Sequence, residues 1–131
     1  MEKRQLLKFH QLPGEYAVIR QDSDSPVPAW ATNGDFLSIT RTLNELSIVC
    51  PADHVPKELA TGLRWICLKL EGPFPFSQTG VLLGFIEPLS SNAVPIFAIS
   101  TYDTDYILIP QEHIDRALIL LREAGHELIK Q

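Results

Sequence analysis

The chain has 131 residues, of which 45% are hydrophobic, and its formal net charge is −5 at neutral pH. This size and composition predict a soluble globular protein built as one compact domain or two small ones, and they argue against intrinsic disorder. The 11 lysines and arginines form no basic block, so nothing in the charge pattern favours a nucleic-acid partner.

The sequence also indicates where the protein works. No apolar run approaches the roughly 20 residues that a membrane-spanning helix needs, and the first five residues lead into a strand-like segment, not into the apolar core of a signal peptide. We therefore expect a cytoplasmic protein with no membrane partner.

The two cysteines are expected to be free thiols that pack in the interior. Cys50 and Cys67 lack the spacing of a disulfide framework or of a zinc site. His54 lies four residues after Cys50, but Pro51 intervenes and no second pair completes a tetrahedral site. We expect no metal and no other cofactor.

The first half of the chain predicts strands and loops with little helix. Its expected elements are, in chain order, strands at 5–12 and 15–20, one turn of helix at 28–31, and strands at 36–41 and 45–50. The first two strands are expected to form a hairpin through Leu12-Pro13-Gly14, where glycine tolerates a positive φ. Trp30 is expected to hold the loop at 21–34 against the core. The proline-rich segment 51–62 allows only a turn or two of helix.

The second half predicts a complete α+β unit. Its expected elements are a strand at 63–70, a helix beginning near Gly80, strands at 96–100 and 106–109, a helix around 114–121 and a strand at 126–129. This order is that of a split βαβ, or ferredoxin-like, unit. Pro88 cannot donate to the carbonyl of Gly84, so a kink or a local opening is expected in the first helix. Gly125 is expected to end the second helix.

The hexapeptide from Ser100 to Asp105 concentrates hydroxyls and carboxylates between two apolar runs, 95–99 and 106–109. Polar density of this kind between buried strands indicates contact with a ligand. The apolar pattern recurs 60 residues earlier, where Thr40 corresponds to Ser100 and Glu45 to Asp105.

This recurrence predicts a tandem repeat. The expected fold is α+β, with two ferredoxin-like βαββαβ units at 1–62 and 63–131, the first degenerate because it has nearly lost both helices. A unit without helices cannot cover its sheet alone. We therefore expect the halves to share one extended sheet or to pack side by side, with the sheets sharing one core.

Several motifs resemble those of the ACT-domain family. They are Leu70-Glu71-Gly72-Pro73, Phe76, Thr79-Gly80-Val81, Pro88-Leu89 and the segment 99–109, with 45–51 in the first half. The resemblance is to small bacterial amino-acid-binding members and to cytosolic arginine sensors of the CASTOR type. It implies tandem ACT units, no catalysis, and a free amino acid held between two units.

The residues themselves fit such a ligand. A helix start at Thr79 presents unpaired backbone N–H groups and the positive end of the helix dipole to a carboxylate. Asp105 supplies a negative charge for an ammonium, and the hydroxyls of Ser100 and Thr101 supply further hydrogen bonds. The candidate ligand-binding residues are Phe76, Gln78, Thr79, Gly80, Val81, Ser100, Thr101, Tyr102 and Asp105.

The resemblance also limits the specificity that can be carried over. In the arginine sensors, the aromatic and acidic positions that match Tyr102 and Asp105 contact the ligand. This chain has Pro75 where those sensors have glycine, and Gln78 where they have an acid. The loss of that acid means that arginine specificity does not transfer.

A structural role for the same residues stays open. Asp105 beside a tight turn is a common turn cap, and the hydroxyls of Ser100, Thr101 and Thr104 often bond their own backbone. A helix start at Thr79 is often an ordinary N-cap.

The function expected from the sequence is a regulatory module that binds a free amino acid, and the alternative is a ligand-free ACT protein for interaction or dimerisation. The four histidines are scattered, no nucleophile–base pair or phosphate-binding loop stands out, and no enzyme activity is expected. The first half lacks helices to cover its sheet, so a homodimer through residues 5–62 is expected.

Overall fold

The computed structural model describes residues 6–72 and 80–129, which contain eight β-strands and two α-helices. The chain divides into a smaller unit, Gly14–Trp65, and a larger unit, Met1–Pro13 with Ile66–Gln131. This grouping differs from the expected boundaries of 1–62 and 63–131, because the first strand belongs with the second half. Within the described residues, neither helix is long and apolar enough to cross a bilayer.

The larger unit confirms the predicted order of elements. Its elements are β1 (Lys8–Gln11), β5 (Trp65–Leu70), α1 (Val81–Ser90), β6 (Phe97–Ser100), β7 (Asp105–Pro110), α2 (Ile114–Glu123) and β8 (Glu127–Leu128). The run from β5 to β8 is the βαββαβ order of a ferredoxin-like unit. Gly125 follows α2 with φ +96°, as the predicted C-terminal cap requires.

The sheet of the larger unit is completed by the N-terminal strand. β7 pairs with both β6 and β5. On its other side β5 pairs antiparallel with β1, and β1 pairs parallel with β8. The place beside β5, where a split βαβ unit has its last strand, is therefore taken by β1. The predicted hairpin of the first two strands is wrong, because an apolar pattern identifies a strand but not its partner.

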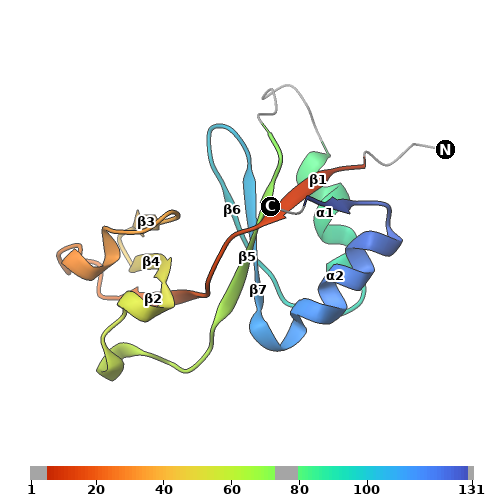
Figure 1. Cartoon of the computed structure of the whole chain (residues 1–131). Helices are drawn as coiled ribbons and strands as arrows, with labels where there is room; N and C mark the ends of the chain where they lie inside the picture. Colours follow the sequence, from red (N-terminus) through yellow and green to blue (C-terminus); the bar gives the residue numbers. More distant parts are fainter. Residues whose placement is uncertain (1–5, 73–79, 130–131) are drawn as a thin grey trace. The chain divides into compact units, whose positions relative to one another are not determined.

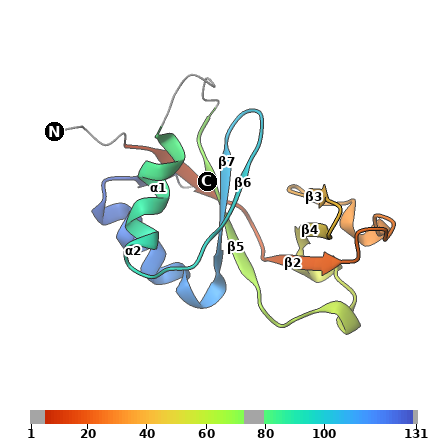
Figure 2. The same cartoon turned by 180° about the vertical axis from the view of Figure 1, so that it is seen from behind.

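Both helices pack on one face of this sheet (Figure 1), and the view from behind shows the same arrangement (Figure 2). The core between them contains Leu7, Phe9, Ile66, Leu68, Leu70, Val81, Phe85, Leu89, Val94, Ile107, Ile109, Ala117 and Leu121. Alternate strand residues point to opposite faces, so those flanking Leu68 and Phe9 lie on the face away from the helices.

The smaller unit is an antiparallel sheet with short turns of helix. Its elements are β2 (Tyr16–Gln21), η1 (Ala29–Ala31), β3 (Ser38–Arg41), β4 (Leu46–Pro51), η2 (Ala52–His54) and η3 (Lys57–Leu59). The strand order is β3-β4-β2. Trp30 packs against the core of this unit, as predicted. The described buried hydrophobic residues include one packed cluster within each unit. The strands form one eight-stranded sheet, in agreement with the predicted α+β fold.

The two hairpins repeat, but their spacing is one residue shorter than the sequence suggested. The N–H of Thr42 donates to the carbonyl of Glu45 at 2.9 Å, and that of Thr101 donates to Thr104 at 2.9 Å. In strand register, Arg41 pairs with Leu46 as Ser100 pairs with Asp105.

The position of Asp105 is therefore matched by Leu46, not by Glu45, and that of Ser100 by Arg41, not by Thr40. Leu46 is 0% exposed. A shift of one residue along a strand exchanges its two faces, which is why a sequence match of apolar positions misplaced the polar ones.

A buried histidine satisfies the hydrogen bond that Pro88 removes from α1. The helix continues through Pro88 to Ser90, and the Gly84 carbonyl lies 3.0 Å from Nε2 of His126. The Leu7 N–H donates to His126 Nδ1 at 3.1 Å, so Nε2 carries the proton and donates to Gly84. His126 is 3% exposed, and it joins the start of the chain to the middle of α1.

We predict that His126→Phe lowers the free energy of unfolding by about 2 kcal/mol or more, because it leaves the Leu7 N–H and the Gly84 carbonyl without partners. In a Pro88→Ala background the loss is expected to be smaller, since the alanine introduced there would supply a backbone N–H to the Gly84 carbonyl. Urea denaturation of the double-mutant cycle measures both terms. The control is His113→Phe at the half-exposed start of α2. Equal losses in the two backgrounds would contradict this role of His126.

Candidate functional site

The polar hexapeptide forms the β6–β7 turn. The Ser100 hydroxyl donates to Oδ1 of Asp105, and these two residues are the last strand pair before the turn. Thr101 Oγ1 donates to the Thr104 carbonyl at 2.9 Å, so this hydroxyl bonds its own backbone. Tyr102 stands at the tip and is 80% exposed.

The turn is fixed to the end of β5 by Thr104. Its side chain is buried, and Oγ1 donates to the Leu70 carbonyl at 2.9 Å. Gly72 lies against the same turn: a Cβ there would be 2.9 Å from the Asp103 carbonyl oxygen and 2.9 Å from the Thr104 Cβ. Gly72 is thus required for close approach, and it brings the residues after β5 next to the hexapeptide.

Polar residues occupy both faces of the sheet near this turn. Asp105 shares a strand face with Ile107 and Ile109, which belong to the core under the helices. Lys69 lies between the core residues Leu68 and Leu70, and therefore points to the other face. His10, which follows the core residue Phe9 in β1, points to that face as well.

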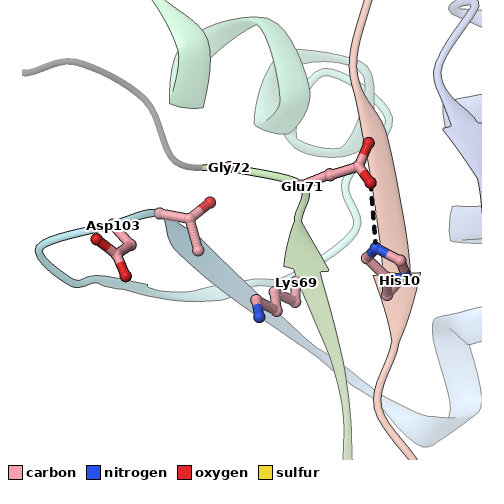
Figure 3. Close-up of a pocket in the computed structure, with 6 residues that line it drawn as sticks. His10, Lys69, Glu71, Gly72 and Asp103 are labelled. Carbon is pink, nitrogen blue, oxygen red and sulfur yellow. Dashed lines mark ion pairs between the residues drawn. The ribbon is translucent and has the colours of Figure 1, made fainter.

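A small pocket lies beside the turn in the larger unit. Its volume is about 160 Å³, and its lining residues are His10, Lys69, Glu71, Gly72, Asp103 and Thr104. Figure 3 shows that they come from three segments: β1, the end of β5 and the β6–β7 turn. The pocket brings one ammonium, two carboxylates and an imidazole together, so it can meet groups of either charge.

The charged groups of this pocket are only partly paired with one another. His10 Nε2 lies 3.8 Å from Glu71 Oε1, the contact drawn in Figure 3. Lys69 Nζ lies 6.0 Å from the centre of the Tyr106 ring, at the outer limit of a cation–π contact. Among the described residues, the buried His10 Nδ1 has no hydrogen-bond partner.

The predicted site residues have different fates. Ser100 and Asp105 are brought together. Gly80 is the exposed N-cap of α1 with φ +78°, and Val81 is buried in the core, so it offers a ligand only its backbone. The predicted contacts at Phe76, Gln78 and Thr79 lie outside the described residues.

No ligand contact was predicted from the sequence for four of the residues that line the pocket, although one of them, Glu71, belongs to an ACT-like motif. They are His10, Lys69, Glu71 and Asp103. A signal existed for Lys69, because it is the one charged residue in the otherwise apolar strand 65–70. Asp103 belonged to the hexapeptide but was assigned no contact.

The cysteines offer no reactive centre. Cys50 and Cys67 are both free and buried. Burial raises the pKa of Cys67 to about 12 and raises that of Cys50 as well. A thiol with a raised pKa is protonated at neutral pH and is a poor nucleophile or metal ligand. Among the described residues, no three His, Cys, Asp or Glu side chains are grouped so as to hold a metal ion.

Known families and structures resemble both halves of this chain. A model described as ACT domain matches residues 61–123, and a second model, described as an N-terminal domain, matches residues 14–58. The Agrobacterium tumefaciens protein Atu0741 is 39% identical, with a TM-score of 0.87 over 97% of this chain and 95% of that one. Residues 61–123 of this chain belong to the ACT-domain family.

More distant similarities agree on the fold. The chain is 26% identical over 125 residues to subunit 1 of the cytosolic arginine sensor for mTORC1 from Homo sapiens, covering 89% of this chain. It spans 36% of that relative's length. The Vibrio cholerae protein VC0802 has a TM-score of 0.74 at 16% identity, covering 97% of this chain and 92% of that one. For aspartokinase alpha and beta subunits the TM-score is 0.59 at 13% identity, over 92% and 98%.

Proposed function

We propose that this protein is a non-catalytic regulatory module whose ACT domain binds a free amino acid at the β6–β7 hairpin and passes the event to a partner or to its own oligomer. The observation that carries the proposal is the pocket beside the hexapeptide, which offers groups of both charges next to the hairpin base. A free amino acid requires such a site, because its ammonium and its carboxylate must both be satisfied when water is removed.

Two further groups near the hairpin, Asp105 and the start of α1, do not line the pocket but offer contacts of their own. Asp105 is half-buried and already accepts one hydrogen bond from Ser100, which holds the carboxylate in place for an ammonium. The first N–H groups of α1, after the exposed Gly80, have no partner within the helix and favour a carboxylate. Thr101 is occupied by its own turn and contributes through the shape of the loop.

The similarity to an arginine sensor supports an amino acid as the class of ligand. That relative is known by name as a sensor of arginine. For this chain we propose an amino acid without naming arginine, because Gln78 and Pro75 replace the acid and the glycine of the sensors it resembles.

The two hairpins are not equivalent sites, and we place the single site in the larger unit. The position of Asp105 is held in the smaller unit by the buried Leu46, which has no charge to offer. Arg41, at the position of Ser100, donates to the backbone carbonyls of Ser23 and Ser25, the second at 2.8 Å. The Arg41 side chain of the smaller hairpin thus stabilises the loop that contains Ser23 and Ser25.

We predict that one or more of the twenty free amino acids raises the melting temperature of the protein, and that Asp105→Ala abolishes this rise. A ligand at 100 times its dissociation constant adds about 2.7 kcal/mol of stability. Glu45→Ala is the matched control, since it removes an acid from the other hairpin. If no amino acid stabilises the parent, the ligand-free alternative is favoured. A variant at Asp105 that responds like the parent would make this residue a turn cap.

We further propose a homodimer formed through the smaller unit. β3 is the outer strand of its sheet, and three of its four residues are exposed. Leu43 at the tip of the hairpin is 97% exposed, and Ile39 on β3 is also exposed. An open strand edge beside exposed apolar side chains is a surface that proteins commonly cover by pairing.

The expected result of light scattering is a dimer at micromolar concentration that Ile39→Lys shifts toward monomer, because a charge on an edge strand opposes pairing. Lys57→Glu on the same unit is an exposed control outside the strands. A monomer at high protein concentration, with and without amino acids, would remove the dimer.

A further inference from the structure

We propose that the pocket beside the hairpin grips the head group of the amino acid, with Lys69 holding the α-carboxylate and with Glu71 and Asp103 holding the α-ammonium. This inference rests on the proposed function, and it replaces Asp105 and the first N–H groups of α1 with residues of the pocket as the direct partners of the two charges of the ligand. It moves the charge recognition to residues that lie on the sheet face away from the helices and at the turn.

Lys69 is the unusual residue of this pocket. It lies in the central strand β5 between two fully buried leucines and is itself half-buried. Its side chain lies on the sheet face away from the helices and lines the pocket. In the described part of the chain its ammonium forms no ion pair, and its contact with the Tyr106 ring is a distant one at 6.0 Å. The ammonium therefore keeps donors for an oxygen ligand.

The acidic side of the pocket is arranged separately. Glu71 lies beside β1, where its Oε1 is 3.8 Å from His10 Nε2. Asp103 enters from the turn, which Thr104 and Gly72 fix against the end of β5. Lys69 and the two carboxylates thus line one pocket without neutralising each other directly. A ligand that carries both charges can bridge them.

The charges also define the class of amino acid. Two carboxylates and one ammonium leave the pocket with an excess negative charge when His10 is neutral. A second carboxylate on the ligand would add repulsion, whereas a neutral or cationic side chain would not. A pocket of about 160 Å³ is small, which suits a head group and a short stem. We therefore infer a neutral or basic amino acid, and neither aspartate nor glutamate.

The test uses the twenty free amino acids as probes, with calorimetry on those that stabilise the protein. Lys69→Gln is expected to weaken binding about tenfold or more, because it removes a charge-assisted hydrogen bond to the carboxylate. Lys69→Arg should retain part of the affinity. Lys8→Gln is the matched control, since Lys8 is an exposed lysine on β1 that does not line the pocket. The amine that lacks the carboxylate of the best probe should bind weakly to the parent and equally weakly to Lys69→Gln.

The possible results distinguish the proposed function from the proposed binding of the head group by Lys69, Glu71 and Asp103, which we call the clamp. If an amino acid binds and Asp105→Ala abolishes binding while Lys69→Gln and Asp103→Asn leave it unchanged, the function stands and the clamp is wrong. Preferred binding of glutamate or aspartate would also overturn the clamp. If no amino acid binds the parent, both the function and the clamp fail. The melting temperature of each variant without ligand shows whether the fold is intact.

Discussion

The hydrogen bond between the Thr104 hydroxyl and the Leu70 carbonyl fixes the geometry on which the proposed site depends. It is buried, it is 2.9 Å long, and it joins the β6–β7 turn to the last residue of β5. Because Gly72 has no side chain, the chain after β5 can lie directly against the turn. Carboxylates from both segments are thereby placed around one small pocket.

β5 is held from both sides and from one face. β1 and β7 pair with its two edges, and the helices cover the face that carries Leu68 and Leu70. The N-terminal strand is secured in turn by His126, which accepts from Leu7 and donates to Gly84 in α1. A single imidazole thus joins the strand that completes the sheet to the helix that Pro88 would otherwise weaken. The unit holds a proline inside α1 without leaving the half-buried Gly84 carbonyl unpaired.

Local patterns predicted most of the elements, and long-range pairing explains what they missed. Apolar alternation located the strands, and the i, i+3, i+4 spacing from Ile114 to Leu121 located α2. The same patterns could not reveal that β1 pairs with β5 and not with β2, because several strands of this chain offer an apolar face. The registry of the two hairpins depends on their turn hydrogen bonds, which a match of apolar letters does not encode. The ACT resemblance supplied the overall fold correctly.

The candidate site was predicted in part for a similar reason. The hexapeptide stood out because its polar residues are consecutive, so Ser100 and Asp105 could be named as candidate site residues from the sequence, while the hydrogen bond between them is seen in the structure. His10 and Lys69 lie 59 positions apart and meet only through the pairing of β1 with β5. No local pattern marks such a pair. Lys69, a lone lysine in an apolar strand, was the one visible signal for this pair. Its role could be interpreted only once the strands beside β5 were known.

The central claim is that a free amino acid binds at the β6–β7 hairpin of the ACT domain. It is tested most directly by mapping amide chemical shifts of the isotope-labelled protein during titration with the best amino acid. The account predicts changes at residues 69–72, 80–81 and 100–105, with little change at 42–45. Changes centred on 42–45, or none at the β6–β7 hairpin at saturating ligand, would contradict it.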